Sequence, residues 1–293
     1  MPSEYSIGEN PLSDRHVMVV AAHPDDETLG AGAAIAEARR ITLVHVTDGA
    51  ESLRRAKRKG FATRAMYARA RGEELQRAFS SVLTEKSFVA LGIRDQRAAF
   101  HIADVAKSLR DLFLDHKPDL ILTHAFEGGH PDHDATAMAV HLAWRTLEMP
   151  VPLYEMTGYN NASGKDVYGV FVPRMDVGTT RVFLSPEAQA RKKAMLAAFA
   201  SQNDTVSRFP LNSESFRPAP CYQFTTAPHA GSMYYENHRL PMTWRLWRML
   251  ARRAAREFEG RATYPHAWDW FFRRMSVMKN SLPGTKPVMI RGS

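Results

Sequence analysis

The sequence predicts an α/β protein with a Rossmann-like parallel sheet flanked by helices, followed by an irregular and helical C-terminal extension. Three observations support this class. Short apolar runs rich in β-branched residues alternate with longer segments whose apolar residues recur at helical spacing. The chain has 293 residues, 44% hydrophobic and 24% charged, which is enough for a buried core in a globular protein. Clusters of acidic residues and histidines directly follow two of the apolar runs, as ligand-binding residues do in doubly wound sheets.

Each predicted element has a local justification. The apolar β-branched runs predict strands at 16–22, 41–47, 87–90, 119–123 and 151–156. The helical spacing of apolar residues predicts helices at 27–40, 62–83, 101–116, 132–147, 186–200 and 241–260. Pro186 suits a first helical turn, and Ser185 before it suits a helix cap.

The pattern changes along the chain and predicts three parts. Residues 1–15 are expected to be a flexible N-terminal arm, and residues 16–205 the α/β core. Residues 206–293 are expected to form a C-terminal extension packed on the core, with 206–235 irregular or β because it is rich in Pro, Ser and aromatic residues.

Cys221 is the only cysteine, which excludes an intramolecular disulfide and any multi-cysteine metal site. A single cysteine fits a reducing compartment. We find no signal-peptide pattern and no apolar stretch long enough to cross a bilayer, so we expect a cytoplasmic protein.

The net charge of +8 is concentrated in two stretches, 54–60 and 239–279. The first, "RRAKRKG", is either a solvated loop or a site for an anionic group of a substrate. The Trp- and Arg-rich segment 241–275 either lies on an anionic membrane, packs on the core or forms a homo-oligomer contact. A membrane contact would make the protein peripheral at the inner membrane face. Arginines interleaved with aromatics also suit nucleic acid, but no nucleic-acid motif accompanies them, so no nucleic-acid partner is expected.

The stretch "AAHPDDETLG" places three consecutive acids at the end of a strand that reads as buried. In an open parallel sheet, ligands bind beyond the carboxyl ends of the strands. Adjacent acids there repel one another unless a positive charge compensates, and a metal ion does so directly. His23 and Asp26 are three residues apart across a tight turn, so both can point at one ion while Asp25 points elsewhere.

A second cluster, "EGGHPDHDA", follows the strand predicted at 119–123 and begins the next helix. Pro131 suits the first helical turn, so His130 lies at the cap and His133 one turn on. The ends of the first and fourth strands can be neighbours in a doubly wound sheet, which would bring both clusters to one cleft. His23, Asp26 and His133 would then form a two-histidine, one-carboxylate set with an open position, which is typical of catalytic Zn²⁺. The same set suits Fe²⁺ or another divalent metal.

Such a metal lowers the pKa of its bound water to about 7, which favours hydrolysis at neutral pH. Asp25 is the expected base. A protonated His130, with its ring held by Asp132, is expected to stabilise the oxyanion. Either Asp25 or His130 is expected to protonate the leaving group. His124, near the second cluster, is expected to be structural or to face solvent. A non-catalytic sugar-binding module with a structural metal is the alternative from another class, and it would need neither Asp25 nor His130.

The motifs "AHPDDE" and "GGHPDH" together resemble the PIG-L/LmbE family of zinc-dependent N-deacetylases, over roughly residues 16–205. That family includes deacetylases of GlcNAc-phosphatidylinositol and of mycothiol and bacillithiol precursors. The resemblance implies a Rossmann-like fold and a site of five residues. Its metal ligands match His23, Asp26 and His133, its general base matches Asp25, and its intermediate-stabilising histidine matches His130.

Weaker matches imply substrate contacts. Arg71, in "RGEEL", resembles the arginine of an R-x-x-E signature that can contact substrate, although Arg71 and Glu74 could equally form an i,i+3 ion pair. Asp95, in "LGIRD", resembles an aspartate that contacts sugar hydroxyls, and "KKAMLAAFASQ", 192–202, resembles a K-x-x-A-L…S-Q helix. The expected substrate is an N-acetylated GlcNAc-type sugar or glycoconjugate, with or without an anionic group, and the products are acetate and a free amine. Hydrolysis of another amide is the alternative.

Overall fold

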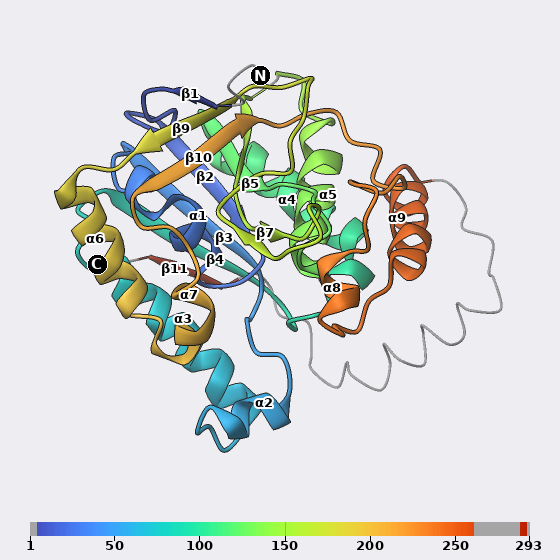
Figure 1. Cartoon of the computed structure of the whole chain (residues 1–293), viewed down its shortest axis with the longest axis horizontal. Helices are drawn as coiled ribbons and strands as arrows, with labels where there is room; N and C mark the ends of the chain where they lie inside the picture. The colour runs from blue at the N-terminus through green and yellow to red at the C-terminus, as the bar shows by residue number, and fades with distance from the viewer. Residues whose placement is uncertain (1–4, 150, 261–287, 292–293) are drawn as a thin grey trace.

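The computed structural model describes residues 5–149, 151–260 and 288–291 (Figure 1). Within these ranges, the main sheet has nine strands in the order β1-β9-β10-β6-β5-β2-β3-β4-β11, and β7 and β8 form a separate pair. The strands are β1 (Tyr5–Ile7), β2 (His16–Ala21), β3 (Arg40–Thr47), β4 (Glu85–Ile93), β5 (Leu120–His124), β6 (Leu153–Met156), β7 (Tyr159–Asn160), β8 (Val167–Tyr168), β9 (Thr179–Phe183), β10 (Ser213–Pro218) and β11 (Val288–Arg291).

The helices follow the apolar spacing of the sequence. They are α1 (Asp26–Ile35), α2 (Leu53–Arg58), α3 (Arg64–Ala78), α4 (Ile102–His116), α5 (Pro131–Trp144), α6 (Pro186–Ala197), α7 (Asn203–Val206), α8 (Tyr234–Asn237) and α9 (Trp244–Phe258), with 3₁₀ turns η1 (Ala98–Phe100) and η2 (Ala200–Gln202). Side-chain caps start several of them. The oxygens of Thr63, Ser185 and Thr243 accept hydrogen bonds from backbone N–H groups in the first turns of α3, α6 and α9.

The centre of the sheet is parallel and doubly wound. β2 pairs in parallel with β3 on one side and with β5 on the other. The chain therefore runs outward through β3 and β4, then returns to continue through β5 and β6. The strand order reverses between β2 and β5, and the loops after these two strands lie at the same edge of the sheet. The α/β class and the predicted adjacency of the first and fourth strands are both confirmed.

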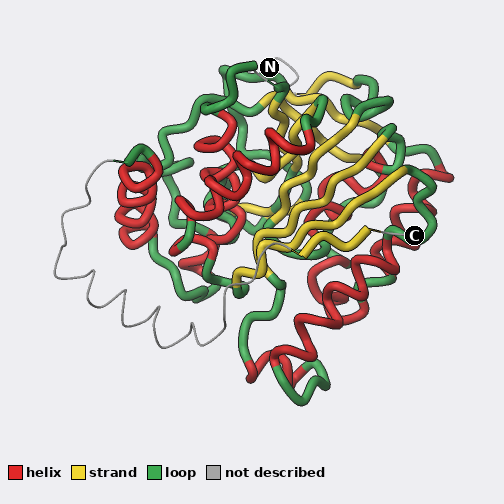
Figure 2. The backbone as a smooth tube through the Cα atoms, turned by 180° about the vertical axis from the view of Figure 1, so that it is seen from behind, coloured by secondary structure: helices red, strands yellow, loops and turns green. Residues whose placement is uncertain are grey.

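Alternating side chains of β2 face two different cores. Val17 and Val19 pack in the core that α1, α3 and α6 cover, whereas Met18 and Val20 pack in the core that α4, α5 and α9 cover. Figure 2 shows the sheet with helices on both sides. With both faces covered, β2 is buried along its whole length, so the loop that follows it starts from a rigid base.

The ends of the chain differ from their predicted descriptions. Residues 5–7, expected in a flexible arm, pair as β1 with β9, and Leu12 is buried. β10 lies beyond residue 205 but is inserted between β9 and β6, so the expected boundary does not interrupt the sheet. The reason is that strand pairing depends on distant partners that no local pattern identifies.

Both basic stretches of the sequence contain a helix. The basic stretch "RRAKRKG", predicted to be either a solvated loop or a site for an anionic group, lies mostly in the short helix α2, which Ser52 caps. In the basic segment 241–275, α9 covers α4 and α5, and Trp247 is buried in their core. Residues 261–275 of that segment lie outside the described residues.

Candidate active site

The first motif forms a tight turn between β2 and α1. The backbone N–H of His23 donates to Asp26 Oδ2 at 2.8 Å, which closes the turn. Asp25 has φ 139°, a backbone conformation that residues with a side chain rarely adopt. Such a conformation costs on the order of 1–3 kcal/mol and persists only where surrounding contacts hold it. The turn thus sends the carboxylates of Asp25 and Asp26 to different partners.

The structure brings the three predicted metal ligands together. Asp26 Oδ2 lies 3.0 Å from His23 Nδ1, and Asp26 Oδ1 lies 3.2 Å from His133 Nε2. The rings of His23 and His133 are 5.3 Å apart, and all three side chains are buried. Ligand atoms close enough to share one ion occur in sets that include His23, His130 and His133, and Asp26, His124 and His133. Such imidazole and carboxylate donors fit a divalent metal such as zinc or iron(II).

His124 joins this cluster from the end of β5. Its ring stacks on His133 with centroids 4.1 Å apart, and it could form a ligand set with Asp26 and His133. However, His124 Nε2 accepts a hydrogen bond from the backbone N–H of Ala22 at 2.9 Å. That nitrogen is therefore occupied, and His124 ties the end of β5 to the end of β2, in keeping with the structural role predicted for it.

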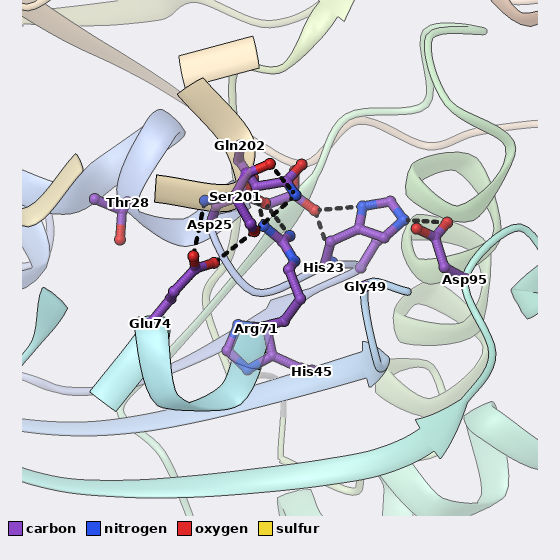
Figure 3. Close-up of polar contacts among 12 residues, drawn as sticks. His23, Asp25, Thr28, His45, Gly49, Arg71, Glu74, Asp95, Ser201 and Gln202 are labelled. Atoms are coloured by element: carbon purple, nitrogen blue, oxygen red, sulfur yellow. Dashed lines mark hydrogen bonds and ion pairs between the residues drawn. The ribbon is translucent and has the colours of Figure 1, made fainter. Parts of the chain in front are cut away.

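Arg71 of α3 contacts the Asp25 carboxylate through two guanidinium nitrogens. Its Nη2 lies 3.2 Å from Asp25 Oδ1, and its Nη1 donates to Oδ2 at 3.4 Å (Figure 3). Gly49 leaves room for the guanidinium, since a Cβ there would lie only 2.7 Å from Arg71 Nε. Burial raises the pKa of Asp25 to about 7, against the opposing effect of the Arg71 charge. The carboxylate is therefore fixed in direction and can exchange a proton near neutral pH.

This geometry changes the interpretation of the Arg71 motif. Arg71 is 2% exposed and lies behind Asp25, so it is placed to hold the base rather than to contact a sugar. Glu74 turns away from it, because its carboxylate accepts hydrogen bonds from the backbone N–H and the hydroxyl of Ser201 at 2.8 and 2.7 Å (Figure 3). The i,i+3 ion pair that the spacing allowed is replaced by this link between α3 and η2.

His130 caps α5 and lies beside the ligands. Its Nδ1 accepts a hydrogen bond from the backbone N–H of Asp132 at 3.1 Å, and its ring meets the His23 ring edge-on with centroids 4.7 Å apart. Burial lowers the pKa of His130, and the neighbouring His23 charge lowers it further. Because Nδ1 is an acceptor, the neutral ring carries its proton on Nε2. This arrangement favours a neutral Nε2–H donor, and the protonated His130 expected from the sequence stays a prediction.

The expected role of Asp132 also requires correction. Its carboxylate does not hold the His130 ring; it accepts hydrogen bonds from the backbone N–H groups of Gln96 and Ala98, and lies 3.3 Å from His23 Nε2. The backbone N–H of Asp132, rather than its carboxylate, contacts the His130 ring. Through its carboxylate, Asp132 anchors the loop after β4 to the site.

Asp95 lies in that anchored loop. Its Oδ1 is 3.3 Å from His23 Nε2, and the side chain is buried. Burial alone would raise the pKa of Asp95, but the nearby His23 lowers it to about 2. Asp95 is thus an ionised group beside the ligands, and the predicted contact with sugar hydroxyls stays a prediction.

Known proteins match the part of the chain that carries these residues. Residues 18–144 match the family model PIG-L, described as GlcNAc-PI de-N-acetylase. The chain is 34% identical to the probable N-acetyl-alpha-D-glucosaminyl L-malate deacetylase 2 of Bacillus anthracis over 46% of this chain and 62% of that relative. It is 32% identical to the 1D-myo-inositol 2-acetamido-2-deoxy-alpha-D-glucopyranoside deacetylase of Corynebacterium jeikeium over 45% of this chain and 50% of that relative. The chain therefore matches less than two thirds of the length of either.

Solved structures share the fold. The zinc-inhibited form of teicoplanin deacetylase Orf2 aligns with a TM-score of 0.55 at 19% identity, covering 69% of this chain and 97% of that one. The N,N'-diacetylchitobiose deacetylase from Pyrococcus horikoshii aligns with a TM-score of 0.51 at 17% identity, covering 71% and 86%. Among the described residues, no helix combines the length and the apolar character needed to cross a bilayer. Residues 18–144, which carry both motifs at one sheet edge, are thus similar to the PIG-L family.

Proposed function

We propose that this protein is a metal-dependent hydrolase that removes the N-acetyl group of a GlcNAc-type sugar or glycoconjugate, releasing acetate and a free amine. The observation that carries the proposal is the convergence of the three candidate ligands beside the Asp25 carboxylate, which Arg71 holds. The substrate class is supported by the relatives, whose names describe deacetylases of N-acetylglucosaminyl compounds.

His23, Asp26 and His133 would hold the metal, which we propose to be zinc, with Fe²⁺ or another divalent ion as the alternative. When bound, the ion would supply Lewis acidity and a water of near-neutral pKa. Asp25 accepts the proton of the attacking water as the water oxygen adds to the acetamido carbon. The Nε2–H of His130 donates a hydrogen bond to the developing oxyanion. The proton then passes from Asp25 to the nitrogen as the carbon–nitrogen bond breaks.

A sugar-binding module with a structural metal fits these observations less well. Such a module has no use for a buried carboxylate held by a buried guanidinium in a strained backbone conformation. A carboxyl group whose pKa is near 7 is suited both to accept and to return a proton. We therefore retain the module, and hydrolysis of another amide, only as outcomes of the test below.

We also propose contacts with other parts of the substrate and with a membrane surface. Asp95 would contact hydroxyls of the sugar, and α2 would contact an anionic group of the substrate. Peripheral contact with an anionic inner membrane face is supported by the exposed arginines of α9, Arg245, Arg248, Arg252 and Arg256. Trp247 does not contribute to such a surface, because it is packed in the core.

The first prediction tests the reaction itself. With zinc loaded, we expect amine release from a panel of N-acetylglucosamine derivatives that includes phosphorylated and lipid-linked members. The Asp25→Asn variant is expected to lose about 10²–10⁴-fold in kcat while its zinc content stays that of the wild type, because only the base is removed.

Asp111→Asn, on the exposed face of α4, is the matched control and should keep full activity. Wild-type protein that is filled with zinc and releases no amine from any member of the panel would contradict the acetyl-sugar proposal. Asp25→Asn with unchanged kcat would remove Asp25 from the mechanism.

A further inference from the structure

Helix α1, which begins at Asp26, is interrupted in its middle. Ala31 departs from helical geometry, with φ −150° and ψ 16°. Gly30, just before it, packs closely on the end of β6, since a Cβ there would lie 2.9 Å from Met156 Sδ and 3.0 Å from the Thr157 carbonyl oxygen. The interruption separates a first turn, residues 26–30, from the rest of the helix.

A buried ion pair is inserted at this interruption. Lys192 Nζ lies 2.8 Å from Glu214 Oε1, and their side chains are 1% and 0% exposed. Lys192 also donates to the Leu29 carbonyl at 2.9 Å. The two Glu214 oxygens accept hydrogen bonds from the backbone N–H groups of Ala33 and Ala34, each at 2.9 Å.

These contacts replace a missing step of the helix. In a continuous α-helix, the N–H of Ala33 would donate to the carbonyl of Leu29. Here Glu214 takes the donor and Lys192 takes the acceptor, so the ion pair bridges the two halves. The charges also suit their positions, because a cation is favourable at the C-terminal end of the first turn and an anion at the start of the second half.

A buried ion pair is energetically costly as a connection within a helix. Two charges must leave water, and a continuous helix packed with apolar residues would avoid that cost. The bridge comes from two elements far from α1 in sequence, α6 and β10, which both pack against α1 (Figure 1). What it controls is the placement of the first turn relative to the rest of the fold.

The first turn carries the residues that face the site. Asp26 lies between His23 and His133, and Glu27 lies 2.9 Å from His45 Nε2 of β3. A shift of this turn would move the Asp26 carboxylate relative to both histidines. We propose that Lys192 and Glu214 are positioning residues that set the first turn of α1 and, through it, the metal-binding geometry of Asp26. This inference rests on the proposed metal site.

The experiment measures metal binding by the full chain rather than activity. Lys192→Met keeps the length and apolar body of the side chain but removes the donor to Leu29 and the charge opposite Glu214. We expect its zinc dissociation constant, from competition with a chromophoric chelator, to rise about tenfold or more, as it does when a group that orients a ligand is lost. We also expect the visible absorption of the Co²⁺-substituted protein to change, because the coordination geometry changes.

Two controls separate positioning from general destabilisation. Lys193→Met makes the same change at the adjacent exposed position of α6 and should leave both readouts at their wild-type values. Phe113→Leu weakens the core on the opposite face of the sheet and should lower Tm without changing zinc affinity or the Co²⁺ spectrum. Glu214→Gln, which keeps side-chain volume, is the second test variant and should act in the same direction as Lys192→Met.

The outcomes are distinct. Wild-type zinc affinity and Co²⁺ spectra in both Lys192→Met and Glu214→Gln would overturn this inference and leave the proposed function intact. The same would follow if Phe113→Leu, at an equal loss of Tm, weakened zinc binding as much. A wild-type protein that bound neither zinc nor cobalt would overturn the metal site itself, and with it both proposals.

Discussion

At the scale of single residues, the site depends on sending two neighbouring carboxylates in different directions. Asp26 lies between His23 and His133, whereas Asp25 turns to Arg71. The turn achieves this with a positive φ at Asp25, which is unfavourable for a residue with a side chain. The two-pronged contact with a buried guanidinium helps to offset that cost. The same contact fixes where the Asp25 carboxylate points.

A change at Arg71 therefore tests whether the arginine holds the base or contacts the substrate. Arg71→Lys keeps the charge but loses the planar fork, so we expect kcat to fall about 10- to 100-fold with KM little changed. Steady-state kinetics on the best substrate of the panel would measure both constants.

Arg69→Met, an exposed position on the same helix, provides the control and should leave both constants unchanged. A large increase in KM at constant kcat in Arg71→Lys would instead indicate that Arg71 contacts the sugar, as the family resemblance implied.

At the scale of elements, the site depends on links between segments that are distant in sequence. α3 presents Arg71 to the site, and Glu74 one turn later fastens α3 to η2 through Ser201. Gln202, the next residue, donates to the Tyr67 hydroxyl of α3 at 2.6 Å. The stretch 192–202 thus serves two helices, with Lys192 at α1 and Ser201 at α3.

We expect Ser201→Ala to destabilise the protein by about 1–3 kcal/mol, because the buried Glu74 carboxylate loses a hydroxyl donor. Urea unfolding of the apoprotein would measure the change. Ser207→Ala, at an exposed position a short distance along the chain, should leave the free energy of unfolding unchanged. Equal stability of the Ser201 and Ser207 variants would show that the link to Glu74 contributes nothing.

A second link joins β10 to β6 through a buried network. Arg217 Nε donates to Glu155 Oε2 at 2.8 Å, and its Nη2 lies 3.1 Å from Glu127 Oε1. Burial raises the pKa values of Glu127 and Glu155 to about 7, although Arg217 opposes the shift. Because burial outweighs the effect of the one guanidinium that the two carboxyl groups share, their protons are retained to higher pH than in the unfolded chain.

Because these pKa values are raised, the fold should lose stability as pH rises. A carboxyl with a folded-state pKa above its ordinary 4.5 stabilises the fold fully below pH 4.5, and this contribution is lost as pH rises to about 7. Glu155→Gln removes one titrating group, so we expect a flatter decline in unfolding free energy over this interval. Urea unfolding at a series of pH values would measure it, and slopes identical to those of the wild type would contradict the assignment.

At the scale of the whole molecule, a hydrophobic core packs on each face of one sheet. The candidate site lies where the strand order reverses, between β2 and β5. The loops after β2 and β5 and the first turns of α1 and α5 supply the candidate ligands, and the neighbouring strands are buried on both faces. Segments from beyond residue 205 complete this frame, because β10 joins the sheet and α9 covers α4 and α5. Metal binding should therefore stabilise the fold as a whole.

We expect zinc to raise Tm and a chelator to reverse the change, because the ion would bind the folded chain only. At a free zinc concentration of about 100 times the dissociation constant, the stabilisation should be about 2.7 kcal/mol. Asp26→Asn should lose most of this response, whereas Asp111→Asn should keep it. Differential scanning calorimetry would measure these responses. A zinc response of wild-type size in Asp26→Asn would exclude Asp26 as a ligand.

The sequence by itself determined the main elements of the α/β core and the grouping of the candidate site. Strand and helix periodicities are local, so the five central strands and the helices around them could be predicted closely. His23, Asp26 and His133 could be grouped because each lies between a strand and the first turn of the next helix, and the ends of parallel strands meet at one sheet edge.

Only the tertiary structure decided which side chains meet across the fold. The pairing of Arg71 with Asp25, the bridge of Lys192 and Glu214 across α1, the turn of Asp132 toward Gln96 and Ala98, and the insertion of β10 each join residues far apart in the chain. A local pattern reports how a segment folds and which of its faces is apolar. It does not report which distant partner satisfies a buried charge, because that partner is selected only when the elements pack and water is excluded.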